Sequence, residues 1–409
     1  MWNMALDRML RHLIRLGELT VVYPDGETRR YGDASTGACV ALALHDPALP
    51  RLLVLSPDMA VGEGYMDGRL TIEGDDLHGF LGLAISNIAA QGHHMALWPI
   101  SALRHALKRV QQFNPMRRAR ANVEHHYDLS GALYDLFLDE DRQYSCAYFT
   151  DPGMTLEAAQ NAKTHHIARK LLLEPGMRVL DIGCGWGGMA LTLARDYGAQ
   201  VVGVTLSVEQ HKMAVDRAKT AGLADRVTFE LMDYRQVAGQ FDRIVSVGMF
   251  EHVGAPHYQA YFDTVKNRLT PDGVALIHTI GRSTPPGTTS PWVTKYIFPG
   301  GYAPSLSETA AAYEHSGLMA TDIEVWRLHY AQTLRHWYDR FMGNIDAAHA
   351  LYDARFCRMW RYYLVASELT FRLNSQVVFQ MQLSRQQDGV PLTRDYLYCE
   401  DEELRHAAE

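Results

Sequence analysis

VLDIGCGWGG, at residues 179–188, has the pattern of a buried strand that runs directly into a glycine-rich turn. The residues that follow, MALTLARDYG, have the pattern of a helix. A turn without β-carbons lets a ligand lie against bare backbone at the N-terminus of that helix. Gly183, Gly185 and Gly188 also satisfy the dinucleotide fingerprint G-x-G-x-x-G, so the turn by itself does not identify the ligand.

The next predicted strand, QVVGVTLS at 200–207, separates two interpretations of the turn. A dinucleotide site normally has an acid there for the ribose hydroxyls, and this chain has Thr205 instead. Asp181, directly before the glycines, is typical of S-adenosylmethionine (SAM) methyltransferases. The segments VTFELMDYR (227–235) and FDRIVSVGMFEHVG (241–254) fall where that fold has its next strands. The pattern favours a SAM site over a nicotinamide site. It also favours a turn that binds a ligand over one that only packs the helix against the strand.

From about residue 165 the chain alternates predicted strands and helices, which is typical of a parallel, doubly wound sheet. The ligand of such a sheet lies beyond the carboxyl ends of the strands, where the glycine turn is. We therefore expect the α/β fold of class I SAM-dependent methyltransferases, Rossmann-like and seven-stranded, with residues 375–385 as an antiparallel last strand. The other predicted strands are 177–182, 200–205, 227–231, 241–247 and 274–280.

The first hundred residues have a different organisation. Residues 1–19 show the apolar spacing of an amphipathic helix, and TVVYPDGETRRYG (20–32) predicts a hairpin that turns at Asp25 and Gly26. Short apolar runs with turn signals follow, so we expect a smaller α+β domain. The expected divisions are an N-terminal domain at 1–103, a basic linker at 104–124 and a catalytic domain at 125–409.

Composition narrows the possible functions. The length of 409 residues favours two domains, and 47% hydrophobic with 21% charged residues is ordinary for a globular protein. A net charge of −8 argues against a general nucleic-acid-binding protein. Five cysteines without a C-x-x-C pair indicate a reducing cytoplasm, without a disulfide framework or a zinc knuckle. Charges every few residues at the N-terminus argue against a signal peptide, and we expect no membrane span.

One segment is basic, although the chain as a whole has a negative net charge. Between Arg104 and Arg120 the chain has six Lys or Arg residues and no acid. A cluster of this kind beside an amphipathic segment is attracted to anionic lipid headgroups. A solvated helix face or linker explains the same residues equally well, so both interpretations stay open.

Candidate active-site residues follow the predicted strands. SVGMFEHVG places Glu251 and His252 just past one strand end, and LIHTIG places His278 past another. The carboxyl ends of parallel strands share one edge of a sheet, so we expect these side chains at the ligand site. The insert at 282–310 is rich in Pro, Gly and aromatic residues, and a loop of this length is usually a lid or a pocket wall.

The order of the motifs resembles that of the bacterial cyclopropane-fatty-acyl-phospholipid synthases and the related mycolic acid cyclopropane synthases. The resemblance covers essentially the whole length of the chain. Its motifs are HYDLS (126–130), YSCAYF (144–149), LDIGCGWGG (180–188), GVTLSVEQ (203–210), GMFEHVG (248–254), HTIG (278–281) and KYIFPGG (295–301).

The resemblance implies that the SAM methyl group is added to a cis alkene in an acyl chain of a membrane phospholipid. Methyl addition gives a carbocation, and loss of a methyl proton closes a cyclopropane ring. In the family the base is a bound bicarbonate ion. Its implied ligands in this chain are Cys146, Glu251, His278, the backbone of Ile280 and Tyr330.

The resemblance also implies a SAM site around Asp181. Gly183 and Gly185 are expected at the methionine portion, and Thr205 with Gln210 at the ribose. The remaining implied cofactor residues are Asp233 and Tyr234 at the adenine, and Tyr144 and Ser145 over the carboxylate side.

Two further interpretations find little support in the residues. Several family members carry a C-terminal cysteine once proposed as a catalytic thiol, and this chain has Ser367 at that place. The adjacent histidine pairs at 93–94, 125–126 and 165–166 invite a metal site. Adjacent residues point apart on a strand or a helix, so we expect no metal.

By resemblance we expect a cytoplasmic homodimer, peripherally associated with the inner face of the membrane, whose N-terminal domain serves lipid binding and dimerisation. Its partners would be unsaturated phospholipids and not nucleic acids. Three alternatives remain: a lipid methyltransferase that leaves a methyl or methylene branch, a nicotinamide oxidoreductase, and a lipid-binding protein with an inactive methyltransferase domain. The intact glycines and Glu251 argue against the last of these.

Overall fold

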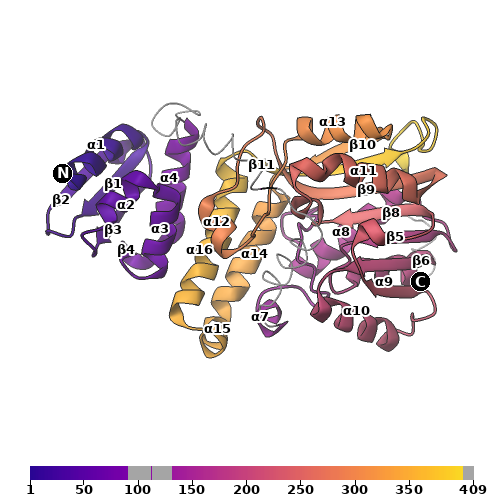
Figure 1. Ribbon diagram of the computed structural model, residues 1–409. Coiled ribbons are helices and arrows are strands. Elements are labelled where there is room, and N and C mark those ends of the chain that lie inside the picture. The colour runs from indigo at the N-terminus through magenta and orange to yellow at the C-terminus, as the bar shows by residue number, and fades with distance from the viewer. Residues whose placement is uncertain (91–111, 113–130, 399–409) are drawn as a thin grey trace.

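The structure is a computed structural model that describes residues 1–90, Gln112 and residues 131–398 (Figure 1). These residues form a four-stranded sheet near the N-terminus and a seven-stranded sheet in the rest of the chain. Nearly all of the predicted linker at 104–124, and the whole HYDLS motif at 126–130, lie outside the described residues. The expected domain boundaries therefore stay predictions.

The N-terminal elements build a small α+β unit. They are α1 (Trp2–Leu13), β1 (Gly17–Val22), β2 (Thr28–Asp33), β3 (Cys39–Leu44), α2 (Leu49–Leu55), α3 (Pro57–Met66), β4 (Leu70–Ile72) and α4 (Leu77–Ala90). The strand order is β2-β1-β3-β4, with β1 parallel to β3 and the other pairs antiparallel. The predicted hairpin is confirmed, because β1 and β2 pair across a turn in which Gly26 has a φ of +85°.

The N-terminal helix is shorter than the predicted range of 1–19, since α1 ends at Leu13. Gly17 begins β1 with a φ of +73°, and a β-carbon there would lie 2.4 Å from the carbonyl oxygen of Ala38. Only glycine tolerates this conformation and this close approach. From Leu19 onward the side chains alternate between core and surface, as a strand requires.

The larger sheet has the strand order β10-β11-β9-β8-β5-β6-β7. Its strands are β5 (Arg178–Ile182), β6 (Gln200–Thr205), β7 (Val227–Leu231), β8 (Phe241–Val247), β9 (Leu269–Arg282), β10 (Met319–Trp326) and β11 (Gln376–Ser384). β5 to β9 pair in parallel, and β11 is antiparallel to both β9 and β10. The predicted seven-stranded α/β fold and its antiparallel last strand at 375–385 are confirmed.

Helices cover both faces of this sheet. The helices of this part are α7 (Gly131–Asp135), α8 (Leu156–Leu171), α9 (Gly188–Tyr197), α10 (Val208–Thr220), α11 (Tyr258–Arg268), α12 (Pro291–Tyr296), α13 (Leu306–Ser316), α14 (His329–Gly343), α15 (Ile345–Leu351) and α16 (Ala354–Leu373). α8, α9 and α10 bury Ile167, Leu193 and Ala214 on one face, and α11 and α13 bury Phe262 and Tyr313 on the other. Burial on both faces explains the continuous apolar runs in the central parallel strands.

The two sheets are joined by helices and by the 282–310 insert. α14 and α16 lie between the sheets (Figure 1), and α16 packs against α3 and α4. From α12 in the insert, the Trp292 indole nitrogen donates to the Met66 sulfur at 3.3 Å, and Lys295 pairs with Glu63 at 2.6 Å. One apolar core therefore extends from the N-terminal sheet through α14 and α16.

Gly62 on α3 and Gly82 on α4 provide a matched test of this contact. A β-carbon on Gly62 would lie 2.3 Å from the Trp292 indole nitrogen, whereas one on Gly82 would meet no atom within 4 Å. Alanine improves helix propensity by up to about 1 kcal/mol at either site, but Gly62→Ala also overpacks a buried ring at a cost of about 1–3 kcal/mol. We expect Gly82→Ala to raise the free energy of unfolding in urea and Gly62→Ala to lower it. A stabilised Gly62→Ala variant would contradict this packing.

Candidate active site

The glycine turn lies between β5 and α9 and has a left-handed backbone. Gly183, Gly185 and Gly187 have φ values of +82°, +54° and +86°. A β-carbon on Gly183 would lie 2.8 Å from the Met249 side chain, and one on Gly187 would lie 2.6 Å from the Phe229 ring. A β-carbon on Gly185 would meet nothing within 4 Å. Packing thus excludes side chains at two glycines, whereas Gly185 borders open space.

The turn lines a cavity of about 160 Å³ at the carboxyl edge of the sheet, which we call the first cavity. The ends of β5, β6 and β8 and the loop after β7 all reach it. The predicted cofactor residues that line it are Tyr144, Ser145, Asp181, Gly183, Gly185, Thr205, Gln210, Asp233 and Tyr234. The structure therefore gathers the whole predicted set at one place, and the role of each residue stays a prediction.

Asp181 is a buried acid with an unused acceptor. It is 2% exposed, and its Oδ2 atom has no hydrogen-bond partner among the described residues. Burial raises its pKa to about 7. A buried oxygen in this state is stabilised by a hydrogen-bond donor, and an ammonium group is such a donor.

Hydrogen bonds and an ion pair hold other polar side chains that line the first cavity. Thr205 Oγ1 donates to Gln210 Oε1 at 3.0 Å, and the Ser207 hydroxyl caps α10 by accepting from the Gln210 backbone nitrogen at 3.3 Å. Asp233 is paired with Arg235 at 2.6 Å. A few polar groups held in this way orient a ligand within an otherwise apolar pocket.

A second cavity, of about 500 Å³, adjoins the first. Tyr144, Ser145, Gly248 and His252 line both cavities, so these residues stand where the two meet. The predicted catalytic residues that line the second cavity are Cys146, Glu251, His278, Ile280 and Tyr330.

The rest of the second cavity is lined by aromatic and aliphatic side chains and by polar ones such as Arg282, Asn374 and Gln376. Trp292 and Phe298 come from the 282–310 insert, which thus forms a pocket wall, and Phe371 comes from α16. Ile88 of α4 also lines it, so the N-terminal domain contributes to the wall. The volume lies within the range of roughly 300–1,000 Å³ that is usual for ligand sites. The lining offers apolar rings for an apolar part of a ligand and polar groups for a polar part.

Glu251 lies in the loop after β8 and is held by β9. Its Oε1 atom accepts the backbone N–H of Ile280 at 2.7 Å. Its Oε2 atom is buried and has no hydrogen-bond partner within the part of the chain that the structure describes. Burial raises the pKa of Glu251 to about 7, although the Ile280 hydrogen bond lowers it in part. The site therefore contains a fixed carboxyl group with one oxygen available.

His278 is a neutral imidazole that lies within β9, whereas the sequence predicted it past the end of the strand, because β9 continues to Arg282. It is level with Val247, the last residue of β8. The side-chain amide of Gln380 on β11 donates to its Nδ1 at 3.0 Å, which leaves the ring proton on Nε2. Burial lowers its pKa well below the usual histidine value. The edge of the ring meets Trp326, with the ring centroids 5.1 Å apart. His278 is thus oriented as a hydrogen-bond donor.

Cys146 and Tyr330 complete the predicted set. Cys146 is fully buried, its thiol donates to the Ala147 carbonyl at 3.4 Å, and burial raises its pKa. It is therefore a neutral thiol and not a nucleophilic thiolate. Tyr330 packs its ring against Phe371, with centroids 4.9 Å apart. Ser367, which stands where several family members have a cysteine, also lines the second cavity.

The histidine pair at 165–166 is not a metal site. His165 bonds the Tyr197 hydroxyl at 2.8 Å, and His166 bonds Glu324 at 2.7 Å. Within the described residues no group of three or more His, Cys, Asp or Glu side chains is placed to hold a metal ion. The pairs at 93–94 and 125–126 lie outside the described residues.

Sequence reasoning missed Gln380 and Lys163. Gln380 is fully buried on β11, and because this strand has two other glutamines, its sequence does not single out Gln380. Lys163 is fully buried on α8 beside Ser145, and a single lysine in a helix carries no such signal. Gln380 bonds His278 and Lys163 bonds Ser145, and neither contact follows from a local sequence motif.

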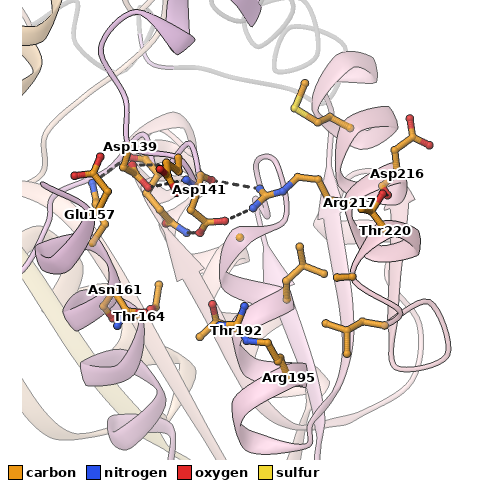
Figure 2. A pocket seen from close by; sticks show the side chains of 18 of the residues that line it. Asp139, Asp141, Glu157, Asn161, Thr164, Thr192, Arg195, Asp216, Arg217 and Thr220 are labelled. Carbon is orange, nitrogen blue, oxygen red and sulfur yellow. Dashed lines mark hydrogen bonds and ion pairs between the residues drawn. The ribbon is translucent and has the colours of Figure 1, made fainter.

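A third cavity, of about 950 Å³, lies between α8, α9 and α10 (Figure 2). Asp141, Gln143 and Gly188 line both this cavity and the first. Arg217 of α10 pairs with Asp141, as Figure 2 shows, and also donates to the Trp186 carbonyl at 2.8 Å. These contacts attach α10 to the segment that walls the first cavity.

Comparison with known proteins identifies the family. Residues 114–381 match the family model for mycolic acid cyclopropane synthetase. The chain belongs to this family. Residues 5–89 match a domain model of unknown function. The chain is 41% identical to the cyclopropane-fatty-acyl-phospholipid synthase of Escherichia coli (strain K12), over 87% of this chain and 91% of that protein. It is 36% identical to the tuberculostearic acid methyltransferase UfaA1 of Mycobacterium tuberculosis, over 93% of this chain and 91% of that protein.

Solved structures agree with this assignment. The cyclopropane synthase MmaA2 of Mycobacterium tuberculosis is 33% identical with a TM-score of 0.63, over 66% of this chain and 99% of that chain. The mycolic acid cyclopropane synthase CmaA1, solved with S-adenosylhomocysteine (SAH) and CTAB, is 34% identical with a TM-score of 0.62, over 66% of this chain and 99% of that chain. The protein is therefore an enzyme of the SAM-dependent methyltransferase class, which decides between the cofactors that the glycine turn left open.

The pKa values of Glu251, which has a buried carboxylate oxygen, and of Glu368, which is 2% exposed, shift in opposite directions. Burial raises the pKa of Glu251 to about 7. Burial alone would raise the pKa of Glu368 too, but hydrogen bonds from His78 and Arg372 lower it below the usual value. Because the pKa of Glu251 is higher in the folded state than in the unfolded state, ionisation of this group opposes folding. The contribution of Glu251 to the free energy of unfolding is therefore fully present below the unfolded-state pKa and is lost as the pH rises through about 7. We expect Glu251→Gln to melt above wild type at pH 8 and together with it at pH 5.

Glu368→Gln is the control with the opposite sign. Its ionised form is stabilised in the folded state, so that stability is present above the unfolded pKa and is lost as the pH falls. This variant should melt below wild type at pH 8, and the difference should shrink in acid. A Glu251→Gln variant that melts below wild type at pH 8 would contradict the burial of an unpaired carboxylate.

Gly185→Val tests whether the turn binds the cofactor. Valine at a φ of +54° is strained, and Gly222 offers a control because it has a φ of +69° with nothing within 4 Å of its β-carbon position. We expect Gly185→Val to lose about 100-fold in SAM affinity by calorimetry, because its side chain occupies the space that borders the cavity. Gly222→Val should keep wild-type affinity. Equal SAM affinity in both variants would show that the turn is only structural.

Proposed function

We propose that the enzyme transfers a methylene group from SAM to the cis double bond of an unsaturated acyl chain in a membrane phospholipid and so forms a cyclopropane ring. The observation that carries this proposal is the junction of two cavities. The first contains the glycine turn, and the second is lined by apolar rings together with Glu251 and His278. The likeness to the phospholipid synthase of Escherichia coli, which extends over most of both chains, supports the same reaction.

The reaction sets three requirements for the site. An alkene carbon attacks the sulfonium methyl, the carbon–sulfur bond breaks, and SAH leaves. Positive charge then rests on the other alkene carbon. A proton departs from the new methyl group, and the electron pair of that C–H bond closes the ring. The protein must therefore align two ligands, exclude water and hold a proton acceptor near a cation.

The residues where the cavities meet serve the first two requirements. Tyr144 is partly buried, and its hydroxyl and that of Tyr363 are hydrogen-bonded at 2.9 Å. Its ring stacks on Trp337 with centroids 5.1 Å apart, which fixes the wall between SAM and alkene. The ring of Tyr330, packed on Phe371, offers a π-face to a nearby cation.

We propose bicarbonate as the base, and the residues present fit such an anion. Glu251 has one buried oxygen without a described partner, which accepts a hydroxyl hydrogen, and His278 presents an N–H donor. The Ile280 amide is already bonded to Glu251, so Ile280 acts by orienting this carboxyl group. When bound, bicarbonate would supply the acceptor for the departing proton. Cys146 and Tyr330 line the same cavity and complete the proposed set.

A methyl- or methylene-branched product is the second candidate. The likeness to a tuberculostearic acid methyltransferase, at 36% identity over 93% of this chain, favours it. The two outcomes share every step up to the cation and differ only in where the proton is lost. Incubation with SAM and unsaturated phospholipid vesicles, followed by mass spectrometry of the fatty acids, distinguishes ring from branch.

Glu251→Gln tests the base. We expect a loss of roughly two to four decades in rate, the usual effect of general acid–base catalysis. The loss should appear in kcat with little change in SAM affinity, because the contact acts at the cation stage. Exhaustive removal of bicarbonate should lower wild-type activity, and its addition should restore it. A near-wild-type rate in Glu251→Gln together with insensitivity to bicarbonate would remove this base and favour the branched product.

We also propose reversible association with the inner face of the cytoplasmic membrane, as a cytoplasmic homodimer. No helix of the described residues is long and apolar enough to cross a membrane. Trp2 and Met4 on α1 are 38% and 66% exposed, and they are apolar groups available to a lipid surface. The basic segment at 104–120 supplies the complementary charge for anionic headgroups.

Vesicle binding tests the role of charge. We expect binding to phosphatidylglycerol vesicles to fall as salt rises, because ionic strength screens surface charge. Replacing Arg104, Lys108 and Arg109 with glutamine should weaken binding to these vesicles and leave SAM affinity unchanged. Co-sedimentation across a salt series measures the first effect and calorimetry the second. Salt-independent binding would count against the headgroup contact.

A further inference from the structure

Lys163 on α8 is a buried lysine without an acidic partner. The residue is 0% exposed, and its Nζ atom donates to Gln143 Oε1 at 2.7 Å and to Ser145 Oγ at 2.8 Å. Both acceptors are neutral groups. Over residues 1–90, 112 and 131–398, no carboxylate forms an ion pair with Lys163. The chain therefore holds a positive charge in its interior with only neutral hydrogen-bond partners.

Lys170 on the same helix is a buried lysine with the usual acidic partners. It is also 0% exposed, but it pairs with Glu324 at 2.5 Å and has Asp322 at 3.6 Å. A buried ammonium group without such partners is unfavourable. Burial lowers the pKa of Lys163 to about 8, although the charges of Asp139 and Asp141 raise it in part. Lys163 therefore stays largely protonated at pH 7, and an anionic ligand nearby would stabilise its charge.

Ser145 connects this charge to both cavities. Its hydroxyl oxygen accepts from Lys163, and because an ammonium group only donates, the hydroxyl hydrogen of Ser145 must point elsewhere. Ser145 lines the first and the second cavity. The Gln160 side chain, on the same face of α8, donates to the carbonyl oxygens of Gln143 and Ser145, both at 3.0 Å. The helix thus holds Ser145 rigidly as a donor at the cavity wall.

The other cations around the first cavity are already paired. Arg142 contacts Asp135 at 2.5 Å, and Arg235 contacts Asp233 at 2.6 Å. SAM carries one anionic group, the carboxylate of its methionine portion. Among the described residues near Ser145, Lys163 is the cation that lacks an anion, so the charges of site and ligand are complementary.

We propose that Lys163 is a positioning residue that selects the carboxylate of SAM through Ser145. Its ammonium group orients the Ser145 hydroxyl toward the carboxylate and supplies the positive charge that the carboxylate neutralises. This inference rests on the proposed placement of Ser145 at the amino-acid end of SAM. It assigns to α8 a part in cofactor recognition, although Lys163 itself lines neither cavity.

Two ligands that differ only in the carboxylate test the proposal. SAH carries it, and 5′-deoxy-5′-(3-aminopropylthio)adenosine is the same molecule without it. Calorimetry on the full-length protein gives the ratio of their affinities, which reports on the carboxylate alone. We expect wild type to bind SAH roughly 10- to 100-fold more tightly than the analogue, as for hydrogen bonds to a charged group.

Lys163→Met, which keeps the length and removes the charge, should bring this ratio close to one by weakening SAH only. Lys170→Gln is the matched control, because it removes an equally buried lysine from the same helix whose partners lie on β10. It should lower stability and leave the ratio at the wild-type value. If Lys163→Met does not fold, Ser145→Ala removes the proposed link while keeping the lysine, and the ratio should fall in the same way.

The outcomes separate the inference from the proposed function. Equal weakening of both ligands by Lys163→Met would make Lys163 a structural residue and overturn the proposal. An unchanged ratio in Lys163→Met or in Ser145→Ala would overturn it as well. Wild type that binds both ligands equally would show that the carboxylate is not recognised at Ser145. Wild type that binds neither ligand would instead remove the SAM-dependent function on which the inference rests.

Discussion

The parallel pairing of β8 with β5 on one side and with β9 on the other is the constraint on which the site depends. Because the three strands run in one direction, their carboxyl ends share an edge, and the loops that follow them must share it too. Asp181, Glu251 and His278 reach the same region for this reason. The hydrogen bond from the Ile280 amide to Glu251, at 2.7 Å, then ties the loop after β8 to β9.

Several buried ionisable groups of the ligand site have no oppositely charged partner among the described residues. Burial shifts the pKa values of Asp181 and Glu251 to about 7 and that of Lys163 to about 8, each toward its neutral form. Two other buried charges of the described residues are paired, Lys170 with Glu324 and Glu368 with Arg372. Unpaired groups reduce stability, but in a site from which water is excluded they interact strongly with a complementary ligand. The loss of stability and the strong interaction with a ligand therefore have the same physical origin, which is the burial of an unpaired charge.

Much of the fold could be predicted from local pattern. The strands of the larger sheet are short apolar runs between turn residues, and Asp25 and Gly26 mark the first hairpin. Local pattern failed where a distant contact overrides it. Apolar helical spacing continues past the end of α1, but the close approach of Gly17 to Ala38 forces the chain into β1. β9 begins at Leu269, before the predicted start at residue 274, because pairing with β8 extends it.

The sequence by itself determined the fold class, the SAM-dependent class of enzyme and the predicted cofactor and catalytic residues that line the two cavities, because these follow from motifs that keep their order along the chain. The tertiary structure decided how those residues are used. It places the Ile280 amide on Glu251, the Gln380 amide on His278 and the Lys163 charge on Ser145. Hydrogen-bond partners and burial depend on contacts between distant segments, and neither periodicity nor motif spacing encodes them.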